Sequence, residues 1–263
     1  MYSRAVELPV TEMKAPGAQL DATQYQIEAI AKYEAIYGQN FISPGGTDSA
    51  RACIARLGLK PGMRVLDVGC GLGGSAFLMA REHGVSVHGI DVSANMLASA
   101  RDRMRALGLA SQVTLEHADV LALPPTTSYD VIYSRDVFLH IYDKPRLMAV
   151  LRGLLRPCGL LFFTDYGRGE AQPSVEFAAY IKQRQYDLRT LYDYRALLQQ
   201  AGFIQVMAED HTSEFVSIMQ VELARIADDA AHADIRQSWL DKLERARRGE
   251  QCWVWCAGRQ DAA

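Results

Sequence analysis

The segment VIYSRDVFLHI, residues 131–141, is an apolar run that ends in ionisable side chains. Arg135 and Asp136 close the run, and His140 follows four residues after Asp136. Burying a charge without a partner costs free energy, so charged residues at the end of this apolar run suggest a function. Histidine titrates near neutral pH and can accept or relay a proton. The segment therefore predicts a site at the end of a strand, with His140 as a catalytic candidate and a structural histidine as the alternative.

A glycine-rich loop, VLDVGCGLGG at residues 65–74, lies earlier in the chain between a predicted strand and a predicted helix. Gly69, Gly71 and Gly74 match the spacing that dinucleotide-binding folds use for a pyrophosphate. Asp67 precedes the first glycine, however, and a carboxylate there repels a phosphate but can hold an ammonium group. S-adenosylmethionine carries such an ammonium and no phosphate. The loop therefore favours this cofactor over a nicotinamide dinucleotide, and a simple tight turn is the alternative.

Two more aspartates follow the next two predicted strands. Asp91 comes about 20 residues after the loop, where a carboxylate can accept hydrogen bonds from both ribose hydroxyls. Asp119 ends the third strand, near the place where an adenine amino group needs an acceptor. Each aspartate alone is compatible with a helix cap. Three carboxylates at successive strand ends, however, line the carboxyl edge of an open α/β sheet, where ligands usually bind.

The elements that position these residues alternate along the chain. Strand-like and helical segments follow one another from residue 64, a pattern that predicts a parallel sheet with helices on both faces. Together with the glycine loop and the three carboxylates, this pattern resembles a class I methyltransferase core. The resemblance implies a Rossmann-like, mostly parallel seven-stranded sheet with helices on both faces and an N-terminal helical lid. The predicted strands span residues 64–69, 86–92, 113–119, 129–136, 160–166, 202–210 and 252–258.

The N-terminal region divides into an arm and a helix. Residues 1–22 show no periodicity and contain prolines, so we expect a flexible arm there. The next stretch, TQYQIEAIAKYEAIYG, predicts an amphipathic helix with Thr23 as a possible cap and a face rich in tyrosine. Those tyrosines either pack in the core or surround a methylated cation with their ring faces. The expected single methyltransferase domain, 23–263, then comprises lid helices at 23–50, a cofactor-binding core at 51–166, and substrate-side helices and last strands at 167–263.

Composition restricts the partners. The chain has 263 residues, 49% of them hydrophobic, and a formal net charge of -3, so no global field attracts nucleic acid. Its longest apolar runs are far shorter than the roughly 20 residues of a membrane span. The five cysteines form no CxxC pair and no zinc-like cluster with histidine, and no secretory signal is recognisable. We therefore expect a cytoplasmic protein with reduced thiols, a small-molecule substrate and no metal; no pattern predicts an oligomeric state.

Beyond these motifs the chain resembles one family, the phosphoethanolamine N-methyltransferases. The similarity covers nearly the whole chain and is closest to the domain that carries out the later methylations in two-domain plant members. The N-terminal stretch, the SRD…LH segment and the YIKQR…Y segment are more specific than any glycine loop. The segments that carry the resemblance are QYQIEAIAKYEAIYGQNFISPGG, VLDVGCGLGG, GIDVSANM, VIYSRDVFLHIYDKP, FTDYGRG, PSVEFAAYIKQRQYDL and YRALLQQAGF.

The resemblance implies roles for individual residues. It implies a catalytic pair of Tyr25 and His140, in which the imidazole holds the tyrosine hydroxyl and the lid closes over the site. The substrate-binding positions that it implies are Gln24, Tyr33, Asp136, Tyr166, Arg184 and Tyr186. The cofactor-binding positions that it implies are Ile42, Ser43, Gly69, Asp91, Val92, Asp119, Val120 and Arg135, to which the loop itself adds Asp67 and Gly71.

These positions carry charges complementary to both ends of a zwitterion. Arg184 offers a fork for phosphate oxygens, and Asp136 meets the positive amine. Some family members place a lysine in the last strand as a further phosphate partner, whereas WVWCAG, residues 253–258, offers none. A single arginine compensates the two negative charges of a phosphate dianion poorly. A substrate with a carboxylate in place of the phosphate is therefore an alternative.

The leading hypothesis is methylation of phosphoethanolamine, or of its mono- and dimethyl derivatives, towards phosphocholine, with S-adenosylhomocysteine as the cofactor product. The alternative enzyme is an N- or S-methyltransferase for another small zwitterionic amine or amino acid. A cofactor-binding sensor without catalysis is a third hypothesis, against which Tyr25, Asp136 and His140 argue. A dehydrogenase is the weakest, because Asp67 disfavours a nicotinamide dinucleotide.

Overall fold

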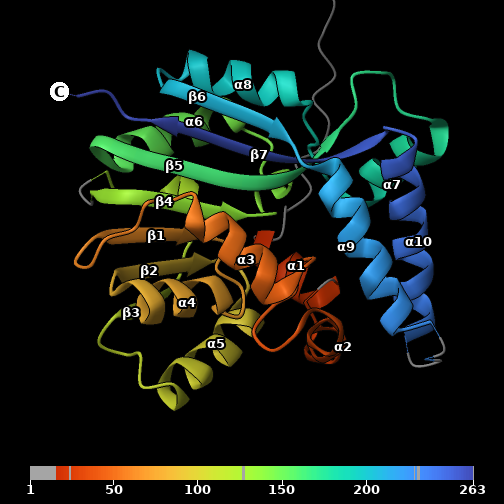
Figure 1. Ribbon diagram of the computed structural model, residues 1–263, viewed down its shortest axis with the longest axis horizontal. Coiled ribbons are helices and arrows are strands. Elements are labelled where there is room, and N and C mark those ends of the chain that lie inside the picture. Colours follow the sequence, from red (N-terminus) through yellow and green to blue (C-terminus); the bar gives the residue numbers. More distant parts are fainter. Residues whose placement is uncertain (1–15, 24, 126–127, 228, 230–231, 263) are drawn as a thin grey trace, which may run out of the picture.

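The structure is a computed structural model that describes residues 16–23, 25–125, 128–227, 229 and 232–262. Its centre is a seven-stranded sheet with the strand order β3-β2-β1-β4-β5-β7-β6 and helices on both faces (Figure 1). Strand β7 runs antiparallel to β5 and β6, and the remaining neighbours are parallel. The expected mostly parallel sheet is confirmed. The strands are β1 Arg64–Val68, β2 Ser86–Asp91, β3 Val113–His117, β4 Tyr129–Arg135, β5 Leu155–Arg168, β6 Ile204–Asp210 and β7 Gln251–Arg259.

The helices form two groups. Those that follow β1, β2 and β4 in the chain are the crossover helices of the parallel sheet, and α7, α9 and α10 gather at one end of it (Figure 1). The helices are α1 Pro16–Thr23, α2 Ile27–Tyr37, α3 Gly46–Ala55, α4 Gly74–His83, α5 Ala94–Ala106, α6 Lys144–Leu154, α7 Val175–Arg184, α8 Leu191–Gln200, α9 Thr212–Arg225 and α10 Ala233–Arg247. Two short 3-10 helices are η1 Val120–Ala122 and η2 Phe138–His140.

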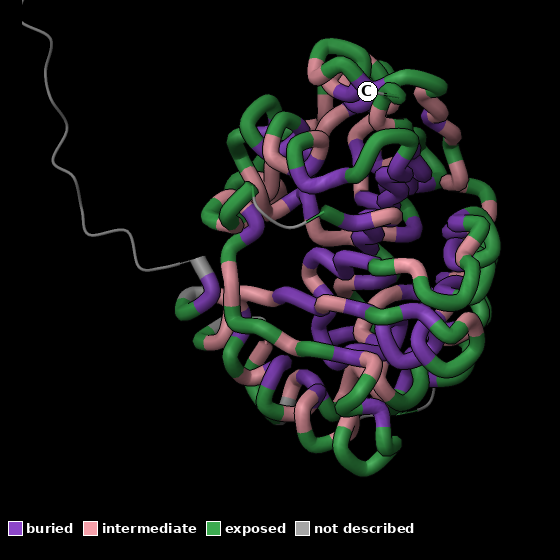
Figure 2. Tube along the Cα trace, turned by 90° about the vertical axis from the view of Figure 1, so that its left-hand side faces the viewer, coloured by how far each residue is buried: buried purple, intermediate pink, exposed green. Residues whose placement is uncertain are grey.

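Alternation along the central strands divides the core into two layers. Side chains in a strand point alternately to opposite faces of the sheet. Val65 and Val131 are paired in register and belong to the layer under α3, α4, α9 and α10. Leu66 and Ile132, one residue further along each strand, belong to the layer under α6 and α8. The buried residues lie mostly in the middle of the molecule, and the exposed residues lie mostly on its outside (Figure 2).

Side-chain caps begin the helices that flank the site. The Ser93 hydroxyl accepts a hydrogen bond from the Met96 amide and starts α5. Ser174 caps α7 in the same way through the Phe177 amide. Thr190 and Asp193 form a reciprocal capping box at the start of α8. Serine, threonine and aspartate are favoured at these positions because they satisfy amides that have no partner within the helix.

The N-terminal expectation is wrong for the part of it that the structure describes. Residues 16–22 lie in helix α1 rather than in an irregular arm, and residues 1–15 lie outside the described residues. Proline favours the first turn of a helix because its fixed φ suits that position. Thr23 ends α1 and does not cap the tyrosine-rich helix, which begins at Ile27. The Asp21 carboxylate accepts a hydrogen bond from the Ser93 hydroxyl, so α1 is attached to the start of α5.

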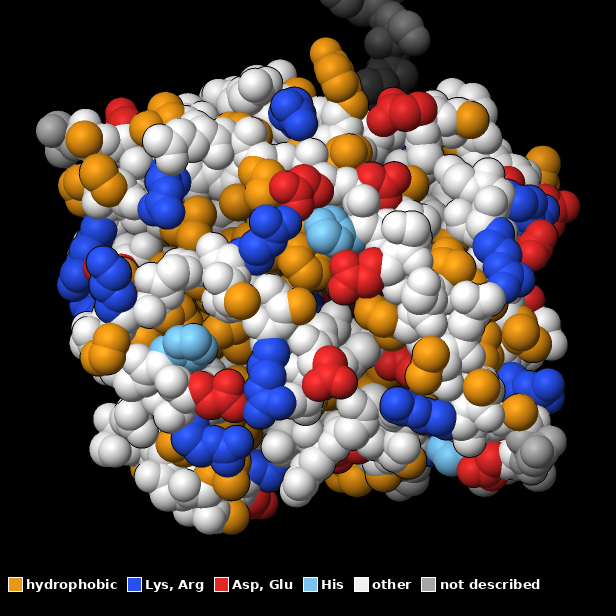
Figure 3. Space-filling view, in the orientation of Figure 1, with side chains coloured by type: hydrophobic (Ala, Val, Ile, Leu, Met, Phe, Trp, Pro, Cys, Tyr) orange, Lys and Arg blue, Asp and Glu red, His pale blue; other side chains and the backbone are white. Residues whose placement is uncertain are grey.

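The face of the molecule that Figure 3 shows has no dominant charge. Basic and acidic side chains are interspersed over the face that Figure 3 shows, consistent with the net charge of -3. None of the helices in the described residues has the length and apolar character needed to cross a membrane. No group of three or more histidine, cysteine or acidic side chains within the described ranges is arranged to hold a metal ion.

Candidate active site

The glycine loop after β1 packs tightly against its neighbours. The amides of Gly69 and Cys70 donate to the Ile90 carbonyl oxygen at 2.8 and 3.0 Å, so the loop is held beside the end of β2. Gly69 has a φ of 72°, and a Cβ there would come within 2.3 Å of Val137 Cγ2. Only glycine fits this position. A Cβ on Gly71, by contrast, would meet nothing within 4 Å, which leaves open space beside the loop.

Asp67 lies below this loop as a buried carboxyl group. It is 2% exposed, and its Oδ2 has no hydrogen-bond partner among the described residues. Burial raises the pKa of Asp67 to about 8, and the charge of Asp91 contributes in the same direction. A buried polar group without a partner is costly, so this carboxyl group suits a cationic ligand. The ammonium of S-adenosylmethionine has the required charge.

Asp91, at the end of β2, links the glycine loop to the next helix. Its Oδ2 accepts from the Gly71 amide and its Oδ1 from the Ser93 amide, both at 2.8 Å. Burial raises the pKa of Asp91 despite these hydrogen bonds. Each carboxylate oxygen keeps a second lone pair and can still accept from a hydroxyl. The geometry therefore fits the predicted ribose contact.

The other predicted cofactor residues frame the same edge of the sheet. The exposed Asp119 carboxylate accepts from the Leu121 amide at 2.9 Å and starts η1, whose first residue, Val120, is buried. Val92 is half-buried, and α1 packs against its carbonyl group: a Cβ on Gly17 would come within 1.7 Å of the Val92 carbonyl oxygen. Helix α1 therefore covers the segment between β2 and α5.

Arg135 is oriented toward protein backbone. Its guanidinium donates to the carbonyl oxygen of Gly46 at 3.1 Å and also to that of Pro44. From the other side, Glu222 Oε1 accepts from the Gly45 amide at 2.7 Å. These bonds fix the turn that follows Ile42 and Ser43, both half-buried. Arg135 thus acts on this segment through the 44–46 turn, and a direct cofactor contact stays a prediction.

Tyr25 lies between the cofactor edge and the tyrosines of the substrate side. Its side chain packs with Leu72 of the glycine loop and with Met96 of α5. Burial raises the pKa of its hydroxyl, followed by the neighbouring Tyr186 and the charge of Asp91. Residues from both sides thus surround this hydroxyl. Gln24, the neighbouring substrate candidate, lies outside the described residues.

Asp136 is held in an unusual conformation at the end of β4. Its φ of 57° is in the left-handed region, which is uncommon for non-glycine residues and at active sites can be part of the mechanism. Its Oδ1 accepts from Thr164 Oγ1 and from Trp253 Nε1, both at 2.8 Å. Its buried Oδ2 has no partner among the described residues. One oxygen therefore anchors the side chain, and the other remains available to a cation.

Aromatic rings surround the Asp136 carboxylate. Burial raises the pKa of Tyr37 and of Tyr166 well above the usual value, and the charge of Asp136 adds to both shifts. Tyr33 stacks on Tyr37 with ring centroids 6.4 Å apart. Ring faces attract ammonium groups. A carboxylate beside such rings is suited to an amine that carries methyl groups.

His140 lies in the short helix η2, one turn beyond Asp136. Its imidazole contacts the Tyr186 ring edge-on, with centroids 5.2 Å apart. Burial, followed by the charges of Lys144 and Arg184, lowers the pKa of His140 to about 4. The imidazole is therefore neutral at pH 7 and can accept a proton. No hydrogen bond joins it to the Tyr25 hydroxyl among the described residues, so their catalytic pairing stays a prediction.

Three cations lie beside aromatic rings of the substrate side. The guanidinium of Arg184 lies 5.7 Å from the centroid of the Tyr180 ring, and Lys242 Nζ lies 4.6 Å from that of Tyr166. Arg245 lies 4.2 Å from the Tyr180 centroid. Burial lowers the pKa of Lys242 to about 8, and the charges of Arg245 and Arg184 lower it too. None of the three forms an ion pair with a carboxylate in the described part of the chain.

Lys242 and Arg245 are candidate site residues that the sequence reasoning did not include. The last strand offers no lysine, as expected, but the cations come instead from α10. A signal for them exists in the sequence, because Trp239, Leu243 and Ala246 are buried at helical spacing. Lys242 and Arg245 adjoin this stripe and therefore point inward. The expectation that a single arginine meets the anion stays a prediction, but the structure places two further cations near Arg184.

The comparisons with known proteins agree with this geometry. A family model described as a methyltransferase domain matches residues 59–230. The chain belongs to this family. The match starts before β1 and ends after α9, so this methyltransferase domain includes every strand except β7.

Similar proteins include two plant enzymes. Over 245 residues the chain is 42% identical to phosphoethanolamine N-methyltransferase 1 of Arabidopsis thaliana and 44% identical to phosphoethanolamine N-methyltransferase of Triticum aestivum. Both matches cover 89% of this chain, and they cover 50% and 48% of the respective relatives. The chain thus spans about half the length of these relatives. The resemblance inferred from the motifs is confirmed.

A solved structure extends the comparison to the fold. Phosphoethanolamine N-methyltransferase 2 of Haemonchus contortus, in complex with phosphomonomethylethanolamine and S-adenosylhomocysteine, superimposes with a TM-score of 0.91. The match covers 95% of this chain and 61% of that one, at 34% identity. The class I methyltransferase fold is therefore confirmed.

Proposed function

We propose that this chain methylates the nitrogen of phosphoethanolamine, or of its mono- and dimethyl derivatives, with S-adenosylmethionine as methyl donor. The plant and nematode relatives support the reaction class through their names and through the molecules bound in the nematode structure. The observation that carries the proposal is the charge arrangement of the site. Cations without ion-pair partners among the described residues lie beside the Tyr180 and Tyr166 rings, and Asp136 offers a buried oxygen that has no hydrogen-bond partner there.

The cofactor fits the edge of β1, β2 and β3. Asp67 offers an uncompensated carboxyl group for its ammonium, and Gly71 leaves open space beside the loop. Asp91 would accept hydrogen bonds from the ribose hydroxyls, and Asp119 would accept one from the adenine amino group. When bound, the cofactor supplies a methyl group on a positively charged sulfur. Tyr25 and the helices that follow it are proposed to act as the lid over this edge.

The substrate side fits a phosphorylated amine. A phosphate dianion is well compensated by Arg184 together with Lys242, because charge-assisted hydrogen bonds from two cations replace those of water. Tyr166 and Tyr186 add neutral donors. At the other end Asp136 attracts the ammonium, and the Tyr37 ring tolerates its methyl groups. A second cation therefore favours phosphate over the carboxylate that the sequence alone left open.

Methyl transfer needs the free amine, since a protonated nitrogen has no lone pair. His140 is neutral at pH 7 and is proposed to accept the proton, either directly or through the Tyr25 hydroxyl. The nitrogen then forms its new bond to carbon as the carbon–sulfur bond breaks, and the released proton stays on the imidazole until it reaches solvent. Asp136 orients the nitrogen and stabilises the positive charge of the methylated product.

A substrate panel tests this proposal. Radioactive methyl transfer from S-adenosylmethionine is measured with phosphoethanolamine and its mono- and dimethyl forms, alongside ethanolamine, glycine and sarcosine. We expect turnover with at least one phosphorylated amine and little with the unphosphorylated ones. Turnover of glycine or sarcosine alone would support the carboxylate alternative and refute the phosphate assignment. Tight cofactor binding with no methylated product from any amine would instead favour a sensor.

We also propose a cytoplasmic location. The five thiols are free, two of the five buried in the cofactor half at Cys53 and Cys70, which suits a reducing compartment. Cell fractionation of the tagged protein tests this, and recovery with a membrane or secreted fraction would contradict it.

A further inference from the structure

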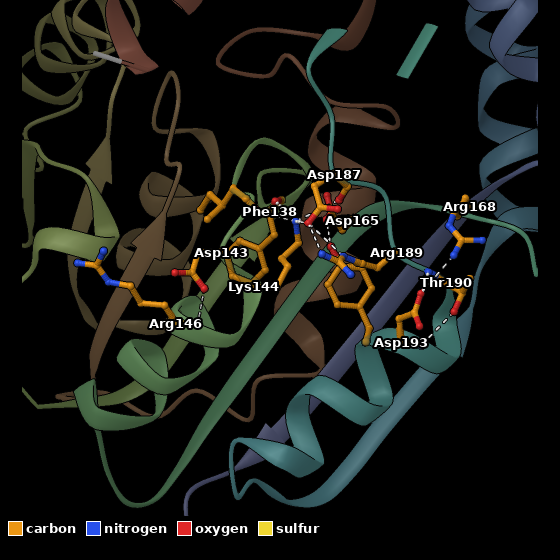
Figure 4. Close-up of polar contacts among 12 residues, drawn as sticks. Phe138, Asp143, Lys144, Arg146, Asp165, Arg168, Asp187, Arg189, Thr190 and Asp193 are labelled. Atoms are coloured by element: carbon orange, nitrogen blue, oxygen red, sulfur yellow. Dashed lines mark hydrogen bonds and ion pairs between the residues drawn. The ribbon is translucent and has the colours of Figure 1, made fainter. Parts of the chain in front are cut away.

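A buried lysine lies directly behind the proposed site. Lys144, at the start of α6, has a side chain that is 0% exposed, although lysine is almost never fully buried without a partner. Its ammonium donates to the carbonyl oxygens of Phe138 at 2.8 Å and Ile141 at 2.6 Å. It also donates to the backbone oxygen and to Oδ2 of Asp187, both at 3.1 Å. Figure 4 shows these contacts converging on the lysine.

The acceptors belong to the two segments that carry the substrate side. Phe138 and Ile141 are the residues at either end of the turn that contains His140. Asp187 directly follows Tyr186 and lies three residues after Arg184. A second link supports the first, because the Asp187 amide donates to the Leu139 carbonyl oxygen at 2.8 Å. The ammonium therefore joins the turn of the proton acceptor to the segment of the anion site.

The Asp187 carboxylate is itself fixed from the far side. Arg189 donates to its Oδ2 through Nε at 3.0 Å and through Nη2 at 2.9 Å (Figure 4). Asp165, which is fully buried, lies near enough to raise the pKa of Lys144 against the larger lowering effect of burial. Its Oδ2 accepts a hydrogen bond from the Tyr194 hydroxyl. Two cations and two carboxyl groups thus form one cluster, in which Lys144 and Asp165 are fully buried and Arg189 and Asp187 are partly exposed.

Stability alone does not account for this cluster. Replacing a buried ion pair with apolar side chains of similar volume is often neutral or stabilising, so a fold has little need of a fully buried ammonium. The lysine satisfies carbonyl oxygens at both ends of η2, and a turn with such fixed ends cannot shift independently of Asp187. Misplacement of a reacting group by about 1 Å can cost on the order of 100-fold in rate.

We propose that Lys144 is a positioning residue for methyl transfer. Its ammonium holds the His140 turn and the segment of Arg184 and Tyr186 at a fixed separation, so that the proton acceptor reaches the amine of a substrate whose anion is already bound. This inference rests on the proposed function, because it takes His140 as the proton acceptor and Arg184 as an anion contact.

The test is a KM-against-kcat comparison in purified full-length protein, with phosphomonomethylethanolamine as substrate. Lys144→Met keeps the length of the side chain and removes its charge. We expect kcat to fall by at least tenfold and KM to rise several-fold, because both attached segments are released. The dissociation constant of S-adenosylhomocysteine, measured by calorimetry, should change less than twofold, since Asp67 and Asp91 make no contact with the cluster.

Two further variants separate positioning from folding. Asp187→Asn keeps an oxygen for the lysine and removes the charge, so it should lower kcat by a smaller factor in a protein that folds even if Lys144→Met does not. Tyr194→Phe is the matched control, because it removes a buried hydrogen bond of the same cluster without touching the Lys144 acceptors. We expect it to lower the melting temperature and to leave kcat and KM within twofold.

The outcomes distinguish this inference from the proposed function. Wild-type kcat and KM in both Lys144→Met and Asp187→Asn would overturn the positioning role, as would an equal loss of kcat in Tyr194→Phe. Failure of the proposed function looks different, because the wild-type protein itself then shows no methyl transfer to any phosphorylated amine.

Discussion

The cofactor edge and the substrate side are built in opposite ways. At the cofactor edge the polar groups are acidic and follow three successive strands. Some of their oxygens already accept hydrogen bonds from backbone amides, as those of Asp91 do from Gly71 and Ser93. On the substrate side the cations come from α7 and α10, which lie far apart in the sequence, and they have no carboxylate partner among the described residues. The first arrangement suits a cationic cofactor that is recognised in one pose. The second suits an anion that completes the site when it binds.

The two regions meet at the end of β4. Asp136 takes its hydrogen bonds from Thr164 of β5 and Trp253 of β7, whereas Gly69 of the cofactor loop packs on Val137 next to it. His140 follows within the same turn region. Variants at this junction should therefore affect chemistry most, and variants within either region should affect the binding of one ligand only.

The largest expected effect is at this junction. His140→Ala removes the proposed proton acceptor, and general base catalysis typically contributes about 10²- to 10⁴-fold. We expect kcat for phosphomonomethylethanolamine to fall within that range while calorimetry shows an unchanged affinity for S-adenosylhomocysteine. His140→Gln, which keeps a polar side chain without a titrating group, should be equally impaired. Full activity in either variant would show that the proton leaves by another route.

The next effect should be confined to the cofactor edge. Asp91→Ala removes the acceptor proposed for the ribose hydroxyls and also the link between the Gly71 and Ser93 amides. Hydrogen bonds to charged groups contribute about 1.5–3 kcal/mol, so we expect cofactor affinity to fall by about 10- to 100-fold. With saturating cofactor, the KM for the phosphorylated amine should stay near the wild-type value. A large rise in that KM would mean that the two regions are coupled and that the contrast between them is wrong.

The cofactor edge and the substrate side also differ in how much of each could be predicted from the sequence. The strands and the acidic residues at their ends were predictable, because Asp67, Asp91 and Asp119 lie in local patterns that one α/β topology explains. For the α10 cations the helical spacing indicates an inward direction, but the contact of Lys242 with Tyr166 depends on how that helix packs and was not predictable. Helix α1 was missed because its stability comes from contacts with distant residues, such as the Asp21–Ser93 hydrogen bond.

The contacts of Lys144 also could not be predicted from the sequence. In DKP, following an aspartate cap and preceding a proline, it has the local signature of an exposed helix start. Its acceptors are carbonyl oxygens, which any residue carries, together with Asp187, which is 43 residues away. No spacing rule connects such partners. Backbone acceptors leave no trace in a single sequence.

A moderate effect is expected on the substrate side. Lys242→Met removes one of the cations that face the proposed phosphate, and the loss of one charge-assisted hydrogen bond corresponds to a rise in KM of about tenfold. Lys242→Arg keeps a cation and should raise KM much less. Cofactor affinity should be unchanged in both variants. If Lys242→Met kept the wild-type KM, the second phosphate contact would have to come from Arg245 instead.

The smallest effect is a dependence of KM on pH. Burial, with the charges of Arg245 and Arg184, lowers the pKa of Lys242 to about 8 in the free protein. Lysine is charged below its pKa, so the cation is present at pH 7 and is lost as the pH rises through 8. KM should therefore be about twofold higher at pH 8 than at pH 7 and should approach the value of Lys242→Met above pH 9. Guanidinium stays charged throughout this range, so Lys242→Arg should show a flat KM between pH 7 and pH 9. If the KM of Lys242→Arg rose by the same factor between pH 7 and pH 9, another group would be titrating. The charge of Lys242 would then have no role in substrate binding.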